Sequence, residues 1–329
     1  MKPLTVSFGD ATQRRAEPGF APRRSRRIPK AAQRSCDVVT LPCIPSGKDR
    51  RAVTVRRTPL LGECSAEFFG TMLLILFGCG VVAQVVTGGF PTTTGATGDY
   101  NSIAWGWGLG VAMAVYVAGR LSGAHLNPAV TVALATFKGF PVRKIMPYIG
   151  AQVAGAFVGA LLVRFTYSDA INRVDPDHTK ATQGIFSTSP DIGVSLFTAF
   201  FDQVIGTAIL VAVIFALTSA VNNPPMANTG PLIIGLLVVG IGLGWGANAG
   251  YAINPARDFA PRLASWLTGY HDAWFSTNGP EMYFWVPIIA PLMGGLIGGA
   301  LFVFCIEKFL PAAITNPAEI GVVEPTPLR

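Results

Sequence analysis

The sequence predicts an all-α membrane protein in which six transmembrane helices and two half-helices form an inverted repeat. Three observations lead to this fold class: the scarcity of charge, a series of long uncharged runs, and two short apolar segments that both begin with Asn-Pro-Ala. Only 13% of the 329 residues are charged, whereas soluble domains carry about 25%. This composition argues against a cytosolic enzyme.

Six uncharged runs are long enough to cross a bilayer, which needs about 20 mostly apolar residues. A buried core helix could explain one such run, but not six within 250 residues. No secretory signal peptide is visible before the first run, so we expect the first span to remain in the protein. The predicted spans cover residues 61–86, 102–120, 144–167, 194–219, 230–248 and 283–307.

Charge divides the chain into a basic tail over residues 1–59, a membrane domain over 60–308 and a short C-terminal tail over 309–329. The first tail has a net charge of +10, and the remainder has −3. Its many prolines and charges predict disorder. It could be a solvated tail, a mitochondrial-type transit segment, or a contact to anionic lipid that phosphorylation of Ser25 or Thr58 would release.

The distribution of Lys and Arg predicts the orientation in the membrane. Lys138, Arg143 and Lys144 lie between the second and third spans, whereas the first and second spans are separated only by Asp99 among charged residues. Cytoplasmic loops carry an excess of Lys and Arg. We therefore expect both termini, including the two tails, to be cytoplasmic, most simply at the plasma membrane.

Two apolar segments, 126–137 and 253–266, are too short to span the bilayer. They follow the second and the fifth span, which places them at matching positions of two three-span halves and on opposite sides of the membrane. Such paired short segments indicate an inverted repeat whose half-helices meet near the midplane. The halves also open alike, with Glu67-Phe-Phe-Gly-Thr71 and Gln203-Val-Ile-Gly-Thr207.

Each short segment begins as a helix should. Asn is a favoured N-cap and Pro a favoured first helical residue. A capping Asn accepts a backbone N–H through its side-chain oxygen, so its NH₂ group is left to face outward as a donor. Ordinary capping would explain one such tripeptide, but two at matching positions predict a polar site at the midplane. The tripeptides are Asn127-Pro128-Ala129 and Asn254-Pro255-Ala256.

The residues before each tripeptide are small, and we expect their backbone to line a lumen. Non-helical backbone at membrane depth is tolerated where it lines a polar cavity or is buried in protein. Free carbonyls would then lead to the Asn donors, which suits a small neutral molecule. A bare cation is disfavoured, because two half-helix N-termini place about +0.5 charge each at the same point. The expected carbonyls belong to Gly123, Ala124, His125, Gly250 and Ala252.

Three polar residues in or beside the spans complete the predicted site. Arg257 begins the second half-helix and is expected to project into the lumen, the alternative being a side chain that reaches the interface. Glu67 is expected to accept hydrogen bonds from loop N–H groups and hold one half-helix in place. Gln203, next to Asp202, could do the same for the other half only as a neutral amide.

The body of the chain resembles the aquaporin superfamily and, within it, the aquaglyceroporins, or glycerol facilitators. The segments that carry the resemblance are 122–131, Ser-Gly-Ala-His-Leu-Asn-Pro-Ala-Val-Thr, and 250–259, Gly-Tyr-Ala-Ile-Asn-Pro-Ala-Arg-Asp-Phe. The resemblance implies six spans plus two half-helices, a homotetramer with one pore per subunit, and selectivity through pore width, lining groups and electrostatic barriers. Asp258 after Arg257, and Pro287-Ile288 in the last span, resemble the glycerol-conducting branch.

The resemblance also implies a narrow outer filter formed by Trp107, Gly242, Tyr251 and Arg257. Gly242 stands where water-selective relatives usually carry His, and it would leave room for a three-carbon polyol. Trp105 is the weaker candidate and reads as an interfacial tryptophan. Two residues depart from the family pattern: Tyr251 replaces the usual Phe, so its hydroxyl could narrow or wet the filter, and Gln203 replaces the usual Glu.

Together these features predict a passive channel for glycerol, other small neutral solutes such as urea and polyols, and water, which excludes ions and protons. The alternatives are a mainly water-selective pore and a coupled transporter, which would need acidic residues at the midplane. An enzyme is not expected, since His125, His178 and His271 lie in separate segments. Cysteine spacing offers no metal site. We expect no cofactor and no nucleic-acid partner.

Overall fold

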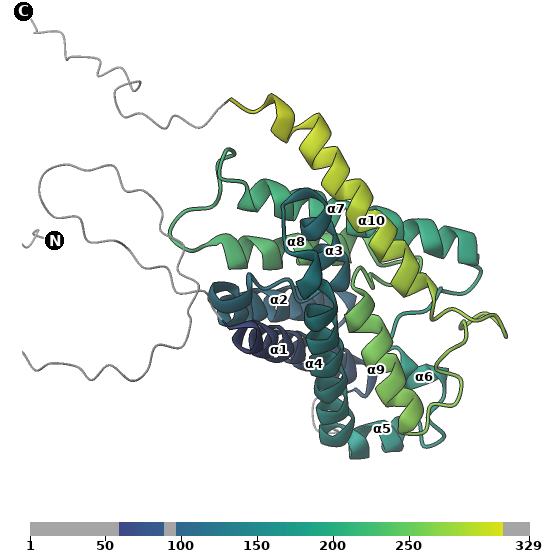
Figure 1. Ribbon diagram of the computed structural model, residues 1–329. Helices are drawn as coiled ribbons and strands as arrows, with labels where there is room; N and C mark the ends of the chain where they lie inside the picture. Colours follow the sequence, from purple (N-terminus) through teal and green to yellow (C-terminus); the bar gives the residue numbers. More distant parts are fainter. Residues whose placement is uncertain (1–58, 89–96, 312–329) are drawn as a thin grey trace, which may run out of the picture. The chain divides into compact units, whose positions relative to one another are not determined.

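The computed structural model describes residues 59–88 and 97–311. The two tails lie outside these residues, as do Ser25 and Thr58 of the first tail. The predicted disorder of that tail therefore stays a prediction. The described part is helical (Figure 1). Its elements are α1 (Leu60–Val86), α2 (Tyr100–Ser122), α3 (Pro128–Phe137), η1 (Val142–Lys144), α4 (Ile145–Thr166), α5 (Ser168–Val174), α6 (Lys180–Gln183), α7 (Leu196–Thr218), α8 (Gly230–Trp245), α9 (Pro255–Leu267), α10 (Val286–Cys305) and η2 (Glu307–Phe309).

The predicted spans are present as α1, α2, α4, α7, α8 and α10. Five of them are long and apolar enough to cross a membrane by themselves; the exception is α8, which has 16 residues. At about 1.5 Å per residue, α8 covers about 24 Å, less than the hydrocarbon core of about 30 Å. It ends at Trp245, earlier than predicted, because residues 246–250 turn back toward the second half-helix.

The packing of the helices repeats between the two halves. α1 packs against α2 and α4, as α7 packs against α8 and α10. α3 of the first half packs against α10 of the second, as α9 packs against α4. The long helices α2 and α8 pack against each other across the repeat (Figure 1). Exchanging the halves maps each of these contacts onto another, which confirms the predicted repeat.

Glycines allow the paired spans to approach closely. A Cβ at Gly155 in α4 would collide with the backbone oxygen of Phe68 in α1, and a Cβ at Gly298 in α10 with that of Ala208 in α7. Gly159 and Gly294 make equivalent contacts four residues away in each helix. Small residues at a spacing of four let membrane helices pack backbone to backbone, so both halves use the same device.

This packing predicts that Gly298→Ala destabilises the protein by about 1–3 kcal/mol, the usual cost of overpacking a close contact. Gly240→Ala is the matched control, because nothing lies within 4 Å of a Cβ at that position, and Ala is the better helix former. Thermal melting of the detergent-solubilised protein should therefore fall for Gly298→Ala alone. Equal melting temperatures for the two variants would contradict this account.

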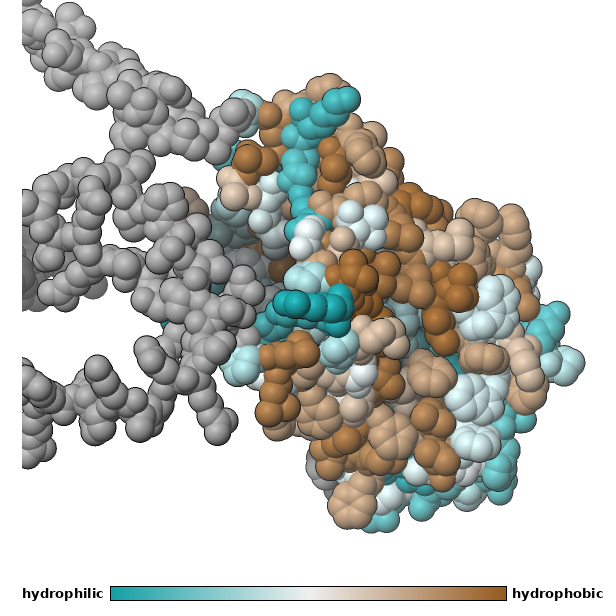
Figure 2. Space-filling model, viewed as in Figure 1, coloured by the Kyte–Doolittle hydropathy of each residue, from teal (hydrophilic) through white to brown (hydrophobic). Residues whose placement is uncertain are grey.

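The surface of the helical part is apolar over most of the face seen in Figure 2. Large apolar side chains stand exposed on the outside of the long helices, among them Phe165, Leu61 and Phe304. Soluble monomers rarely expose contiguous apolar area on this scale. The surface therefore fits a lipid environment, as the lengths of the helices do.

Candidate functional site: a pore between two half-helices

The half-helices α3 and α9 begin at the Asn-Pro-Ala tripeptides. Asn127 Oδ1 accepts a hydrogen bond from the Ala129 N–H at 2.9 Å, and Asn254 Oδ1 accepts one from Ala256 at 3.0 Å. Both Asn residues have extended backbone, and Pro128 and Pro255 follow at the first helical position. The caps thus form as Asn-Pro sequences favour, and they fix the orientation of both side-chain amides.

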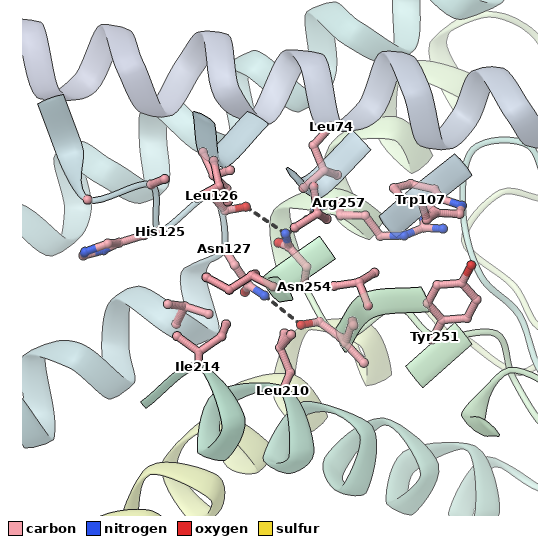
Figure 3. Close-up of a pocket in the computed structure, with 18 of the residues that line it drawn as sticks. Leu74, Trp107, His125, Leu126, Asn127, Leu210, Ile214, Tyr251, Asn254 and Arg257 are labelled. Carbon is pink, nitrogen blue, oxygen red and sulfur yellow. Dashed lines mark hydrogen bonds between the residues drawn. The ribbon is translucent and has the colours of Figure 1, made fainter. Parts of the chain in front are cut away.

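The two caps are also bonded to each other's loops. Asn127 Nδ2 donates to the Ile253 carbonyl at 2.8 Å, and Asn254 Nδ2 donates to the Leu126 carbonyl at 2.8 Å (Figure 3). Leu126 and Ile253 have φ angles of 54° and 42°, a left-handed conformation that is costly for such residues. Each amide carries two N–H groups, so the cross-link leaves one of them for a solute, fewer than the sequence alone suggests.

Three cavities lie in a row through the helical part. The central cavity has a volume of about 330 Å³, and its lining includes Asn127, Asn254, Leu134 and Thr218. Leu134 and Thr218 also line a cavity of about 420 Å³ near the end of α10, beside Glu307. At its other end the central cavity shares Trp107, Tyr251 and Arg257 with a further cavity of about 420 Å³. These three residues therefore lie between the two cavities.

The central cavity has two chemically different walls. One wall comes from the loop residues 123–127 and 251–254, which include the predicted Gly123, Ala124, His125 and Ala252. The other wall is apolar and comes from α1, α2, α7 and α8 (Figure 3). A solute with hydroxyls along one edge and carbons along the other matches both walls. The apolar residues include Leu74, Val111, Val115, Leu210, Ile214 and Val238.

The predicted filter residues Trp107, Tyr251 and Arg257 come together where the two cavities meet. The Arg257 guanidinium carbon lies 4.0 Å from the centroid of the Trp107 ring, and its Nη1 donates to the Phe186 carbonyl at 3.4 Å. The Tyr251 hydroxyl is buried and has no hydrogen-bond partner among the described residues. The predicted alternative, Trp105, is 44% exposed on the outside of α2.

Gly242 lies behind the Tyr251 ring instead of lining the lumen. A Cβ at Gly242 would be 2.8 Å from Tyr251 Cζ and 3.1 Å from Ala104 Cβ, and Gly242 lines none of the three cavities. Its carbonyl accepts a hydrogen bond from the Tyr100 hydroxyl at 2.9 Å. The absence of a side chain at Gly242 therefore leaves space for the Tyr251 ring. It affects a solute indirectly, because the position of that ring sets the space left in the lumen.

Glu67 anchors the loop before α3. Its carboxylate accepts hydrogen bonds from the backbone N–H groups of His125 at 2.9 Å and Leu126 at 2.7 Å. The Ser122 hydroxyl and the Gln152 amide donate to it at 2.6 and 2.8 Å. Glu67 is fully buried, so these four donors stand in for the water it has lost. Gln152 was not among the predicted residues, although an amide inside a membrane span is a usable signal.

Gln203 anchors the loop before α9 in a different way. Its Oε1 accepts the Ile253 N–H at 3.2 Å, and its Nε2 donates to the Gly250 carbonyl at 2.6 Å. The Gly250 carbonyl thus accepts one hydrogen bond from the side-chain amide and keeps a second lone pair, and Gly250 lines the cavity beyond Tyr251 and Arg257. The neighbouring Asp202 accepts from the Asn248 amide at 3.0 Å.

A buried ion pair in α9 binds the segment between α4 and α7 (residues 167–195, the outer loop) beside Arg257. Asp258 accepts from Arg262 at 2.7 Å and from the Thr188 N–H and hydroxyl at 2.8 and 2.7 Å. Arg262 also donates to the Thr188 carbonyl at 2.6 Å. Sequence analysis named Asp258 but not Arg262, which the spacing of four residues on a helix could have indicated.

The outer loop has a second polar anchor further from the lumen. The Asp175 carboxylate accepts from the Thr179 N–H at 2.8 Å and from the Thr182 hydroxyl at 2.7 Å. Partial burial opposes its ionisation, but these hydrogen bonds outweigh burial and hold the pKa of Asp175 below its usual value. The loop is thus tied down by an ionised carboxylate at neutral pH.

Within residues 59–88 and 97–311, no group of three or more His, Cys, Asp or Glu side chains could hold a metal ion. The carboxylates next to the lumen, those of Glu67, Asp202 and Asp258, each accept hydrogen bonds from protein groups. The row of cavities provides a path through the helical part. Together with the membrane-spanning helices, this path defines the chain as a membrane channel.

Comparison with known proteins identifies the family. Residues 54–302 match the family described as Major intrinsic protein, and the chain belongs to it. It is 43% identical over 286 residues to a glycerol uptake facilitator protein of Pseudomonas aeruginosa, covering 84% of this chain and 99% of the relative. It is 41% identical over 275 residues to the glycerol uptake facilitator protein of Shigella flexneri, covering 81% and 96%.

The fold is similar to that of a solved channel. The X-ray structure of the aquaglyceroporin from Plasmodium falciparum superposes with a TM-score of 0.68 at 33% sequence identity. The match covers 77% of this chain and 99% of that one. The helical part as a whole therefore has the aquaporin-like architecture that the resemblance implied.

Proposed function

We propose that the protein conducts glycerol and other small neutral solutes, together with water, passively across the membrane. The observation that carries this proposal is the central cavity, whose backbone wall offers carbonyls and Asn N–H groups opposite a wall of apolar side chains. A polyol presents the same two edges. Relatives named glycerol uptake facilitators and an aquaglyceroporin of the same fold support the proposal. Urea and other small polyols fit the same description.

Ion exclusion follows from the position of the half-helices. The N-termini of α3 and α9 point at each other across the Asn127–Asn254 pair, and each carries about +0.5 charge. Arg257 adds a full charge at the filter. A proton-coupled transporter would need an acidic side chain at this point, and among the described residues none lines the central cavity. A mainly water-selective pore is less well supported, because the apolar wall can pack against the carbon atoms of a solute but cannot hydrogen-bond to water.

We expect glycerol to enter proteoliposomes well above the lipid background, without ionic current. Stopped-flow light scattering with glycerol and then sucrose gradients measures both solute and water permeability, and a planar bilayer recording measures current. Protein-free vesicles are the control. A clear proton or cation conductance, or glycerol entry no faster than in protein-free vesicles, would rule the proposal out.

We also propose an orientation of the protein in its membrane. Lys138, Arg143 and Lys144 lie near the start of α4, on the face where α1 begins, and their charge favours the cytoplasmic side. Both termini, the basic tail included, would then be cytoplasmic, with the plasma membrane as the simplest location. We further propose a homotetramer in the lipid bilayer with one pore in each subunit. The exposed apolar helix faces are consistent with lipid or subunit contacts.

A further inference from the structure

We propose that Tyr100 is a positioning residue of the filter formed by Trp107, Tyr251 and Arg257. Its hydroxyl holds the last turn of α8 in place, and that turn keeps the Tyr251 ring at the edge of the path. Tyr100 thus acts through α8 and the ring, and its hydroxyl does not have to touch a solute. This inference rests on the proposed function and deepens it, since it names a residue that sets the ratio of glycerol to water permeability.

The first step is the way in which α8 ends. The last four carbonyls of a helix lack an N–H partner within that helix, and in α8 they belong to residues 242–245. Of these four residues Gly242 is buried, whereas the other three are exposed. The Tyr100 hydroxyl donates to the Gly242 carbonyl at 2.9 Å. Because a buried carbonyl without a partner is costly, this hydrogen bond stabilises the last turn of the helix.

The second step is a pair of glycines that lie one turn apart at this end of α8. A Cβ at Gly246 would overlap with the Tyr100 hydroxyl, and a Cβ at Gly242 would be 2.8 Å from Tyr251 Cζ. Residues four positions apart are neighbours on the surface of a helix. The same side of the helix end therefore contacts the hydroxyl of one tyrosine and the ring of the other.

The third step is the direction in which the ring can move. Further along α8, a Cβ at Gly235 would be 2.5 Å from the Gly108 carbonyl oxygen of α2, so close packing keeps the body of α8 in place when its end loosens. The Tyr251 ring lies against Gly242 and lines both the central and the outer cavity (Figure 3). Since the ring already contacts α8, it can be displaced only into the path, where it obstructs glycerol more than water.

The position of Tyr100 is itself fixed by the start of α2. The N-cap Asp99 accepts through Oδ1 from the Ser102 N–H at 2.9 Å, and its own N–H donates to Ser102 Oγ at 3.2 Å. This capping box orders the first turn, in which Tyr100 is the first residue. Tyr100 also lines the outer cavity, so a direct contact with the solute is the rival explanation that the experiment has to exclude.

The experiment compares glycerol and water permeability on the same vesicles by stopped-flow light scattering. Tyr100→Phe removes the hydroxyl and keeps the ring, so the glycerol-to-water ratio should fall about threefold, within the worth of one net hydrogen bond. Gly246→Ala leaves Tyr100 intact but places a Cβ where the hydroxyl lies, and it should lower the ratio as well. An unchanged ratio in Tyr100→Phe would overturn the inference.

Tyr251→Ser distinguishes action through the ring from direct contact. In this background α8 has no ring to hold, so Tyr100→Phe should change the ratio less than twofold. A direct contact between the Tyr100 hydroxyl and the solute would give the same threefold loss in both backgrounds, which contradicts the inference. Tyr251→Leu serves if the serine variant does not fold, because leucine does not reach the position of Cζ, the ring atom nearest a Cβ at Gly242.

Tyr116→Phe and Gly244→Ala are the matched controls. The Tyr116 hydroxyl also joins α2 to a backbone carbonyl, that of Asn228 at 3.1 Å, but it does so where α8 begins, and Tyr116 lines none of the three cavities. Gly244 lies in the last turn of α8, yet nothing lies within 4 Å of a Cβ there. Both variants should keep the ratio, and a threefold loss in either would count against the inference. If the unmodified protein conducts no glycerol, it is the proposed function that fails.

Discussion

We expect Gly242→His to lower glycerol permeability at least about tenfold and water permeability much less. The reason is the contact between Gly242 and Tyr251. Even a Cβ would be 2.8 Å from Tyr251 Cζ, so an imidazole must push the phenol toward Trp107 and Arg257, into the path. Tenfold corresponds to about 1.4 kcal/mol in barrier height, a modest demand for a side chain displaced in a packed filter. Water passes a narrower opening because it needs no room for a carbon backbone.

Two variants show that the ring carries this effect. Gly242→Ala should already reduce glycerol flux, since it adds only the colliding Cβ, whereas Gly240→Ala should not, because that position is open. Tyr251→Ser combined with Gly242→Ala removes the ring that the methyl group meets and should recover glycerol entry. Both fluxes are measured on the same vesicles and normalised to protein content. A loss by the same factor for water and glycerol would mean that the narrow point lies elsewhere.

The sequence was sufficient to predict what depends on local chemistry. Uncharged runs predicted the spans to within a few residues at most ends, and Asn-Pro-Ala predicted where α3 and α9 begin, because capping is a property of neighbouring residues. The shortfall at α8 is also local, since a turn at residues 246–250 ends the helix early. The pairing of Glu67 with loop N–H groups was predictable because a buried carboxylate must be satisfied.

What the sequence could not predict depends on which groups meet in space. The cross-links from Asn127 and Asn254 need Leu126 and Ile253 in a left-handed conformation, which their residue types disfavour. From the sequence, Gly242 was expected to widen the lumen, whereas in the structure the Tyr251 ring packs against it. Nor could sequence say whether Gln203 acts as acceptor or donor, since an amide does both.

Glu67→Met has the largest expected effect on folding, because the two halves are anchored unequally. Methionine matches glutamate in length but offers no comparable acceptor, so the N–H groups of His125 and Leu126 lose their buried partner. Each unpaired backbone donor costs about 1–3 kcal/mol, or about 2–6 kcal/mol together. Ser122 and Gln152 can lessen their own losses, since the hydroxyl also contacts the Ala118 carbonyl and the amide also contacts Thr131.

Gln203→Met is the comparison that isolates the carboxylate. It leaves the Ile253 N–H and the Gly250 carbonyl without their side-chain partner. Gly250 lines a cavity, so water can replace the amide at the carbonyl, and the expected cost is that of the one N–H, about 1–3 kcal/mol. Melting temperature and the yield of folded protein in detergent should therefore fall for both variants, and clearly further for Glu67→Met. In vesicles, Glu67→Met should reduce water and glycerol permeability together, since the whole loop before α3 loses its support. Equal destabilisation by the two variants would show that the extra hydrogen bonds of Glu67 add nothing to the stability of the first half.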